Sequence, residues 1–138
     1  MLTDLAGSKK AARRTAEILK RFEASWNQTK TRFDELIALD EYFKPLIAIR
    51  EFITQLELAE GKELYRLGAA MHTLMISRSV DHGLRLDQKF ILIEAIAQDD
   101  FEVSLRDGSK IYRQYRIKDL KDTRLTKLLQ TLKSTLID

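Results

Sequence analysis

The sequence of 138 residues predicts a mainly α-helical protein with one accessory β-hairpin, on two observations. Over most of the chain, apolar side chains recur at spacings of three and four residues, which is the period of an amphipathic helix. Alternation of apolar and polar side chains by two, the period of a strand, is confined to residues 101–117. We therefore expect about five helices in one bundle-like domain, with a long N-terminal helix and an antiparallel hairpin before the C-terminal helix.

The composition is typical of a folded chain that stays out of membranes. It is 44% hydrophobic and 33% charged, with one proline and five glycines. We expect a single domain over residues 1–138, with disorder confined to the termini, residues 1–7 included. The absence of cysteine excludes disulfides, thiolate zinc sites and a cysteine nucleophile. The N-terminus lacks the apolar core of a signal peptide, and no run reaches the roughly 18 apolar residues of a membrane span, so we expect a soluble, cytoplasmic protein.

The net charge of +3 is small, but the charges are unevenly distributed. Residues 1–30 carry seven basic and three acidic side chains, whereas residues 31–60 carry three basic and seven acidic ones. Residues 101–138 are basic again, with nine against five. The basic ends could meet the acidic middle within one chain or between copies.

The longest helical pattern begins after Ser8, a suitable N-cap, and continues to about Leu39. Its apolar stripe consists of Ala12, Thr15, Leu19, Phe22, Trp26, Thr29, Phe33 and Leu36. An unbroken helix over residues 8–39 would be about 45 Å long, so it would span the domain or overhang it. The weak helix formers of residues 27–31 could also break it, and the sequence leaves both forms open.

Three further helices are predicted before the hairpin, and one after it. Pro45 suits the first turn of a helix whose buried stripe is Leu46, Ile49, Ile53 and Leu56. Residues 64–78 carry a further helical face, residues 81–83 suit a turn, and residues 88–98 are apolar on almost every side and predict a central buried helix. After the hairpin, Asp122 or Thr123 caps a helix with the stripe Leu125, Leu128, Leu129, Leu132 and Leu136.

The turn of the hairpin decides which side chains share a face. A three-residue loop at 106–108 pairs Val103 with Ile111, whereas a two-residue loop at 107–108 pairs Val103 with Tyr112. We prefer the first register because it gathers the apolar residues on one face, namely Phe101, Val103, Leu105, Ile111, Tyr115 and Ile117. The other face would then hold Glu102, Ser104, Lys110, Tyr112, Gln114 and Arg116.

The first functional hypothesis is protein–protein assembly, in an adaptor or in a subunit of a larger complex, with the long N-terminal helix and the β-hairpin as contact surfaces. Large aromatic side chains are frequent anchors of interfaces, and Phe22, Trp26 and Phe33 lie on one stripe of the long helix. They are the candidate contact residues for a protein partner or for self-association. The alternative is that they belong to the ordinary core.

The second hypothesis is nucleic-acid binding. The candidate residues are Lys9, Lys10, Arg13 and Arg14 in the first turns of the long helix, and Lys110, Tyr112 and Arg116 on the outward face of the hairpin. Residues 62–117 resemble a winged helix in layout alone, but the mostly apolar residues 88–98 would make a poor recognition helix. The alternative for both basic sets is a solvated surface.

Catalytic and metal-binding patterns are absent from the sequence. No Glu-x-x-His pair of a di-metal bundle occurs, and His72 and His82 lack the further ligands of a zinc site. Glu57, Glu60 and Glu63 suit a solvated or ion-paired stripe better than acid–base catalysis. We therefore expect no enzymatic activity, no cofactor, no metal and no small-molecule substrate.

Overall fold

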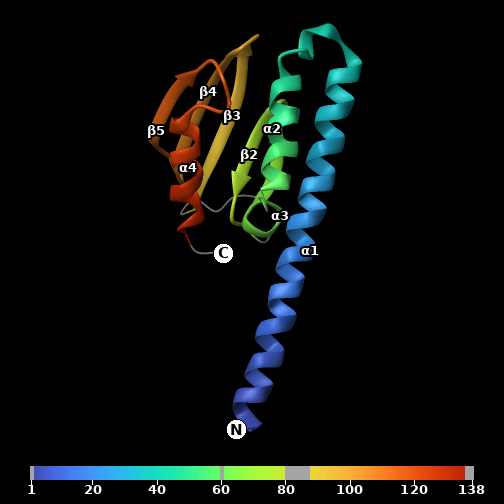
Figure 1. Ribbon diagram of the computed structural model, residues 1–138, viewed down its shortest axis with the longest axis vertical. Coiled ribbons are helices and arrows are strands. Elements are labelled where there is room, and N and C mark those ends of the chain that lie inside the picture. The colour runs from blue at the N-terminus through green and yellow to red at the C-terminus, as the bar shows by residue number, and fades with distance from the viewer. Residues whose placement is uncertain (1, 60, 80–87, 136–138) are drawn as a thin grey trace.

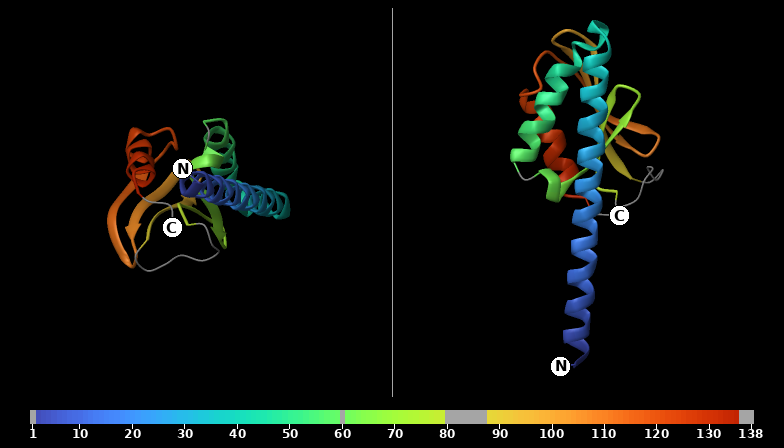
Figure 2. Two further views of the ribbon diagram at one scale, coloured as in Figure 1. Left: turned by 90° about the horizontal axis from the view of Figure 1, so that it is seen from below. Right: turned by 90° about the vertical axis from the view of Figure 1, so that its right-hand side faces the viewer.

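The computed structural model describes residues 2–59, 61–79 and 88–135, and for residues 2–11 it describes only the course of the backbone. The elements are α1 (Leu2–Leu39), the 3-10 helix η1 (Glu41–Phe43), α2 (Leu46–Leu58), α3 (Gly61–Leu64), β1 (Arg66–Ala70), β2 (Thr73–Ser77), β3 (Lys89–Ala97), β4 (Asp100–Asp107), β5 (Lys110–Ile117) and α4 (Thr123–Lys133). The five strands found in the described residues form one antiparallel sheet in chain order. Helices α2 and α4 lie over one face of this sheet, and α1 runs along its β1 edge (Figure 1 and Figure 2).

The prediction of a mainly α-helical bundle with a single hairpin is wrong. Most of residues 64–78 and 88–98, which we expected to be helical, form strands β1, β2 and β3. In β3, Ile91 and Ile93 face the helices with no exposed area, while Phe90 and Leu92 lie partly buried on the opposite face. A short run that is apolar on both faces has no period that distinguishes a buried strand from a buried helix.

The turn between β1 and β2 explains why these two strands were not predicted as a hairpin. Ala70 pairs with Thr73, so the loop consists of Met71 and His72 alone, and Met71 has a φ of 58°. This left-handed conformation costs a residue other than glycine roughly 1–2 kcal/mol. The turn therefore lacks the glycine or asparagine by which a hairpin is recognised in a sequence.

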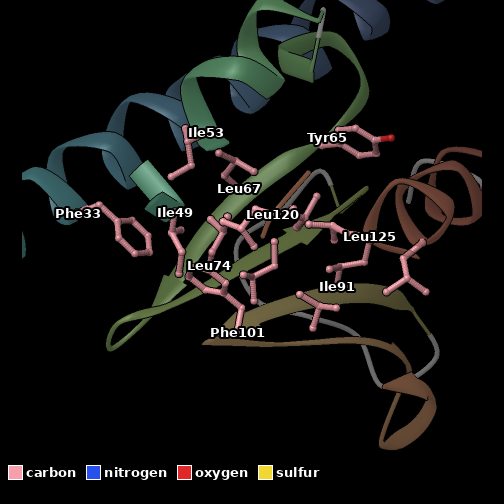
Figure 3. Packing of buried hydrophobic residues seen from close by; sticks show 14 of the residues in the cluster. Phe33, Ile49, Ile53, Tyr65, Leu67, Leu74, Ile91, Phe101, Leu120 and Leu125 are labelled. Atoms are coloured by element: carbon pink, nitrogen blue, oxygen red, sulfur yellow. The ribbon is translucent and has the colours of Figure 1, made fainter. Parts of the chain in front are cut away.

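The core lies between the sheet and the helices (Figure 3). Alternate residues of the strands point inward and are buried, namely Leu67, Leu74, Ile76, Ile91, Ile93, Phe101, Val103, Leu105 and Ile117. The helices and the connection before α4 cover them with Phe33, Leu36, Leu46, Ile49, Ile53, Leu120, Leu125, Leu128 and Leu132. Burial of this apolar surface is the main force that holds the two layers together.

Helix α1 is continuous over 38 residues, without a break at residues 27–31. At about 1.5 Å per residue it is roughly 57 Å long. From residue 12 onward, its first buried side chain is Phe22, and none of residues 12–21 is buried. Figure 1 shows that the N-terminal part of the helix extends beyond the rest of the molecule. We call residues 12–21 the projecting segment. The disorder expected for residues 1–7 stays a prediction.

The β4–β5 hairpin exists as predicted, but neither proposed register is correct. Asp107 pairs with Lys110, so the loop consists of Gly108, with a φ of 63°, and Ser109. A register shift between Leu105 and Arg106 then leaves Tyr112 as an extra residue on β5. As a result Val103 pairs with Tyr115, and Ile111 moves to the outer face, where it is 52% exposed.

Other predictions are confirmed. Helix α2 follows Pro45 and buries Leu46, Ile49 and Ile53. Helix α4 begins after Asp122, whose side chain accepts a hydrogen bond from the Arg124 backbone amide at 2.9 Å. The turn predicted at residues 81–83, including His82, lies outside the described residues.

The Asp122 cap predicts a pH-dependent stability. Hydrogen bonds from the Arg124 side chain and backbone lower the pKa of Asp122 to about 2. Because this pKa is below the unfolded value of about 3.9, the stabilisation is complete above the unfolded pKa and is lost as the pH falls through the folded pKa. We expect Asp122→Ala to lower the Tm at neutral pH, and the difference from the parent protein to shrink between about pH 4 and pH 2. A Tm difference that is the same at all pH values in thermal unfolding would contradict this assignment.

Candidate interaction surface

Helix α1 is fixed to the rest of the molecule around Trp26, whose side chain has no exposed area. The indole Nε1 donates a hydrogen bond to the Tyr65 carbonyl oxygen at 2.9 Å. The ring also lies against Gly61, because a Cβ atom at Gly61 would come within 2.9 Å of the Trp26 Cη2 atom and 2.5 Å of the Leu56 carbonyl oxygen. Position 61 therefore has no room for a side chain.

Two further hydrogen bonds connect this region to the sheet and to α4. Ser25 Oγ accepts from the Leu67 backbone amide at 3.1 Å, which gives a partner to an amide of the edge strand β1. The Tyr65 hydroxyl donates to the Leu129 carbonyl oxygen at 3.0 Å. Burial raises the pKa of Tyr65, so the hydroxyl keeps its proton and remains a donor. Together with Trp26, these contacts join α1, β1 and α4.

Ion pairs hold the C-terminal half of α1 against α2. Lys30 lies 2.8 Å from Glu57, and Arg50 lies 2.8 Å from Asp34. The hydrogen bond from Lys30 lowers the pKa of Glu57, so this carboxylate stays ionised at neutral pH. Half of α1 thus has partners on the sheet and on α2.

The projecting segment differs from that anchored half. Its basic side chains Arg13, Arg14, Lys20 and Arg21 are all exposed, and Glu17 pairs with Arg21 at 2.9 Å. The candidate residues Lys9 and Lys10 lie on the same helix, but their side chains lie outside the described residues. The structure thus places an exposed, mainly basic helix beyond the sheet.

The aromatic residues that we proposed as partner contacts lie elsewhere. Phe22, Trp26 and Phe33 have no exposed area. They therefore form no accessible surface in this chain, and Trp26 and Phe33 belong to the core cluster. Their position is that of ordinary core residues, which was the alternative interpretation of this stripe.

The basic residues of the hairpin are exposed, as predicted, but they are not close to the projecting segment. Lys110, Tyr112 and Arg116 lie on the edge strand β5, at the opposite end of the sheet from β1 and α1. Arg116 donates to both carboxylate oxygens of Asp100 at 2.7 and 2.9 Å, which lowers the pKa of Asp100. Arg113 lies over the Tyr112 ring at 4.5 Å. The two basic sets therefore do not form one surface.

Exposed apolar side chains at the C-terminal end of α1 were not predicted. Leu39, Tyr42 and Met71 are 73%, 76% and 79% exposed. The rings of Phe43 and His72 lie 6.4 Å apart, which brings η1 close to the β1–β2 turn. No periodic signal identifies these residues, because they end a helix or occupy a turn.

Among the open grooves in the described part of the chain, two border the sheet or the helices that cover it. One of about 420 Å³ lies between α1 and β1 and contains Arg32, Arg66, Ser77 and Ser79. The other, of about 1030 Å³, lies between α2 and the connection from β5 to α4, with Phe52, Leu56 and Leu120 in its wall.

Among the described residues, no three His, Cys, Asp or Glu side chains lie close enough to bind a metal ion together. Within the same residues, no helix has the length and apolar character needed to cross a membrane.

Comparison of the chain with protein-family models, with curated proteins and with solved structures found no match. The interpretation of the surface therefore depends on its own geometry and charge.

The contact between Trp26 and Gly61 predicts a strong effect of a small substitution. Gly61→Ala should lower the free energy of unfolding by about 1–3 kcal/mol, because the added methyl group has no space. Gly68→Ala is the matched control, since a Cβ atom there would meet only the Met75 Cβ at an ordinary 3.8 Å. Urea unfolding followed by the fluorescence of the single tryptophan measures both variants. Equal stabilities of the two variants would contradict the proposed role of Gly61.

Proposed function

We propose that the protein is a non-enzymatic interaction or assembly component, an adaptor or a subunit of a larger complex, that binds its partner through α1. One observation carries the proposal: α1 continues beyond the sheet as the projecting segment, in which no side chain of residues 12–21 is buried. An isolated helix of this length is only marginally stable in water. A partner that packs against it would supply the tertiary contacts that it lacks.

The charge of the projecting segment indicates the nature of the partner. Four basic side chains against one acidic side chain favour an acidic protein surface. The exposed acidic residues Asp34, Glu35 and Glu41 of the same chain lie at the other end of α1 or just past it. These three residues are out of reach of the projecting segment within one molecule, and an acidic surface of another molecule would provide partners for its basic side chains.

Strand β5 is a less suitable contact surface than we expected of the hairpin. An edge strand that adds a partner strand is usually flat and apolar. Here the extra residue Tyr112 distorts the edge, and Lys110, Arg113 and Arg116 charge it. These features favour protection against strand pairing.

Nucleic-acid binding is the second candidate function, and the exposed Arg13, Arg14, Lys20 and Arg21 favour it. Such binding would depend on phosphate contacts along one helix, because β5 lies at the far edge of the sheet. The protein would then bind a generic duplex or single strand at low salt, with an affinity that falls steeply as salt is added. A titration without binding at low salt eliminates this candidate.

The absence of cysteine is compatible with our further proposal that the protein acts in the cytoplasm.

Site-specific photo-crosslinking in an extract of the source cells tests the assembly proposal. A photoreactive residue at Ala16, which is exposed on the projecting segment, should give a crosslinked protein adduct. The matched control carries the same residue at Thr126, which is exposed on α4, and should give none. Mass spectrometry then identifies the adduct as a second copy or as another protein. No protein adduct at Ala16, or equal adducts at both positions, would overturn the proposal.

A further inference from the structure

The exposed face of α1 has an ordered charge distribution. Two neighbouring rows of side chains run along it at seven-residue spacing, opposite the buried stripe that contains Trp26. The first row is Arg13, Lys20, Asn27 and Asp34, and the second is Arg14, Arg21, Gln28 and Glu35. All eight side chains are exposed. Each row begins basic, is uncharged at its third position and ends acidic.

Two further features fit this charge distribution: acidic residues follow the C-terminal end of the helix, and small side chains lie between the rows at its middle. Asp40 and Glu41 follow directly after α1 and are exposed. Between the two rows, Ala24 and Thr31 are exposed near the change of sign, and both are small. Small uncharged side chains at this level let a second helix approach closely.

We propose that two copies of the chain pair through this face, with their α1 helices antiparallel and a two-fold axis between Asn27 and Gln28. The proposal rests on the proposed function, and it names the partner as a second copy. In an antiparallel pair the first row of one helix faces the second row of the other. Lys20 then lies opposite Glu35 and Arg21 opposite Asp34, while Arg14 comes to the level of Glu41 in η1, just past the end of the partner helix. The symmetry repeats each pair.

The antiparallel direction follows from charge. A parallel pair in register would bring the basic halves together and the acidic halves together, which is unfavourable. The antiparallel pair brings each basic half against an acidic half. It also places the small Ala24 of one copy at the level of Thr31 of the other, and Asn27 at the level of Gln28. The face is therefore complementary to itself.

The shape of the molecule leaves this face accessible. In the right-hand view of Figure 2, the C-terminal part of α1 runs in front of the sheet and the other helices, and its N-terminal part extends beyond them. A second α1 can lie against it while each sheet stays on its own side of the helix pair. The projecting segment of each copy would then lie along the anchored half of the other copy. This arrangement supplies the contacts that the projecting segment lacks in one molecule.

Some charges on the face already have partners within the chain. Arg21 pairs with Glu17, and Asp34 pairs with Arg50. The Asp34 side chain nevertheless remains 59% exposed. For Arg14, Lys20, Glu35 and Glu41, no side-chain hydrogen bond or ion pair occurs among the described residues. These four are the side chains to change, because their substitution leaves the contacts within the chain intact.

Charge reversal in two complementary variants tests the pairing. The first variant carries Arg14→Glu and Lys20→Glu, and the second carries Glu35→Lys and Glu41→Lys. Each variant alone would place like charges opposite one another, so we expect its dimer dissociation constant to rise by at least about a hundredfold. An equimolar mixture restores every opposite-charge pair in a heterodimer. Sedimentation velocity should show a dimer for the parent protein, monomers for each variant and a dimer for the mixture.

A control and the contrary outcomes complete the experiment. Lys110→Glu with Lys127→Glu reverses two exposed charges on β5 and α4, and this variant should remain a dimer. Circular dichroism checks that every variant is folded. A parent protein that is monomeric at high concentration, a mixture that stays monomeric, or open-ended polymers in place of a dimer would each overturn the pairing. If the parent is monomeric while Ala16 crosslinks to another protein, the proposed function stands and the pairing alone fails.

Discussion

The contact of the Trp26 indole with Gly61, together with the hydrogen bond from Trp26 Nε1 to the Tyr65 carbonyl oxygen, determines where α1 joins the core. C-terminal to this point, the helix covers the edge of β1 and pairs with α2. N-terminal to it, only Phe22 and Ser25 are buried among the described side chains. The position of one aromatic side chain therefore separates an anchored half from a projecting half.

The two edges of the sheet show the same division between covered and free surface. Helix α1 covers β1, and the Ser25 hydroxyl accepts a hydrogen bond from the Leu67 amide of that strand. The other edge, β5, is exposed and has an irregular register and several basic side chains, which discourage the addition of another strand. The most suitable surface for a regular contact is consequently the exposed face of α1.

Sequence reasoning predicts the elements whose apolar pattern has one clear period. It identifies α1, α2 and α4, the Asp122 cap and the β4–β5 hairpin. It fails for β1 to β3, where apolar side chains on both faces of β3 and a turn at Met71 without glycine hide the strands. The contact of Gly61 with Trp26 joins segments that are distant in the chain, so no local pattern reveals it. The charged rows of α1 are visible in the sequence, but only the burial of the stripe that contains Trp26 shows that these rows face outward.

Hydrogen exchange along α1, measured at a low and a high protein concentration, tests most directly the claim that Trp26 divides the helix. At low concentration we expect the amides of residues 12–21 to exchange quickly, and those of residues 26–36 to be strongly protected. At high concentration the amides of residues 12–21 should gain protection, because a second helix then covers them. If the whole helix were uniformly protected at low concentration and its protection did not change at high concentration, both the division at Trp26 and the pairing that we derive from it would be contradicted.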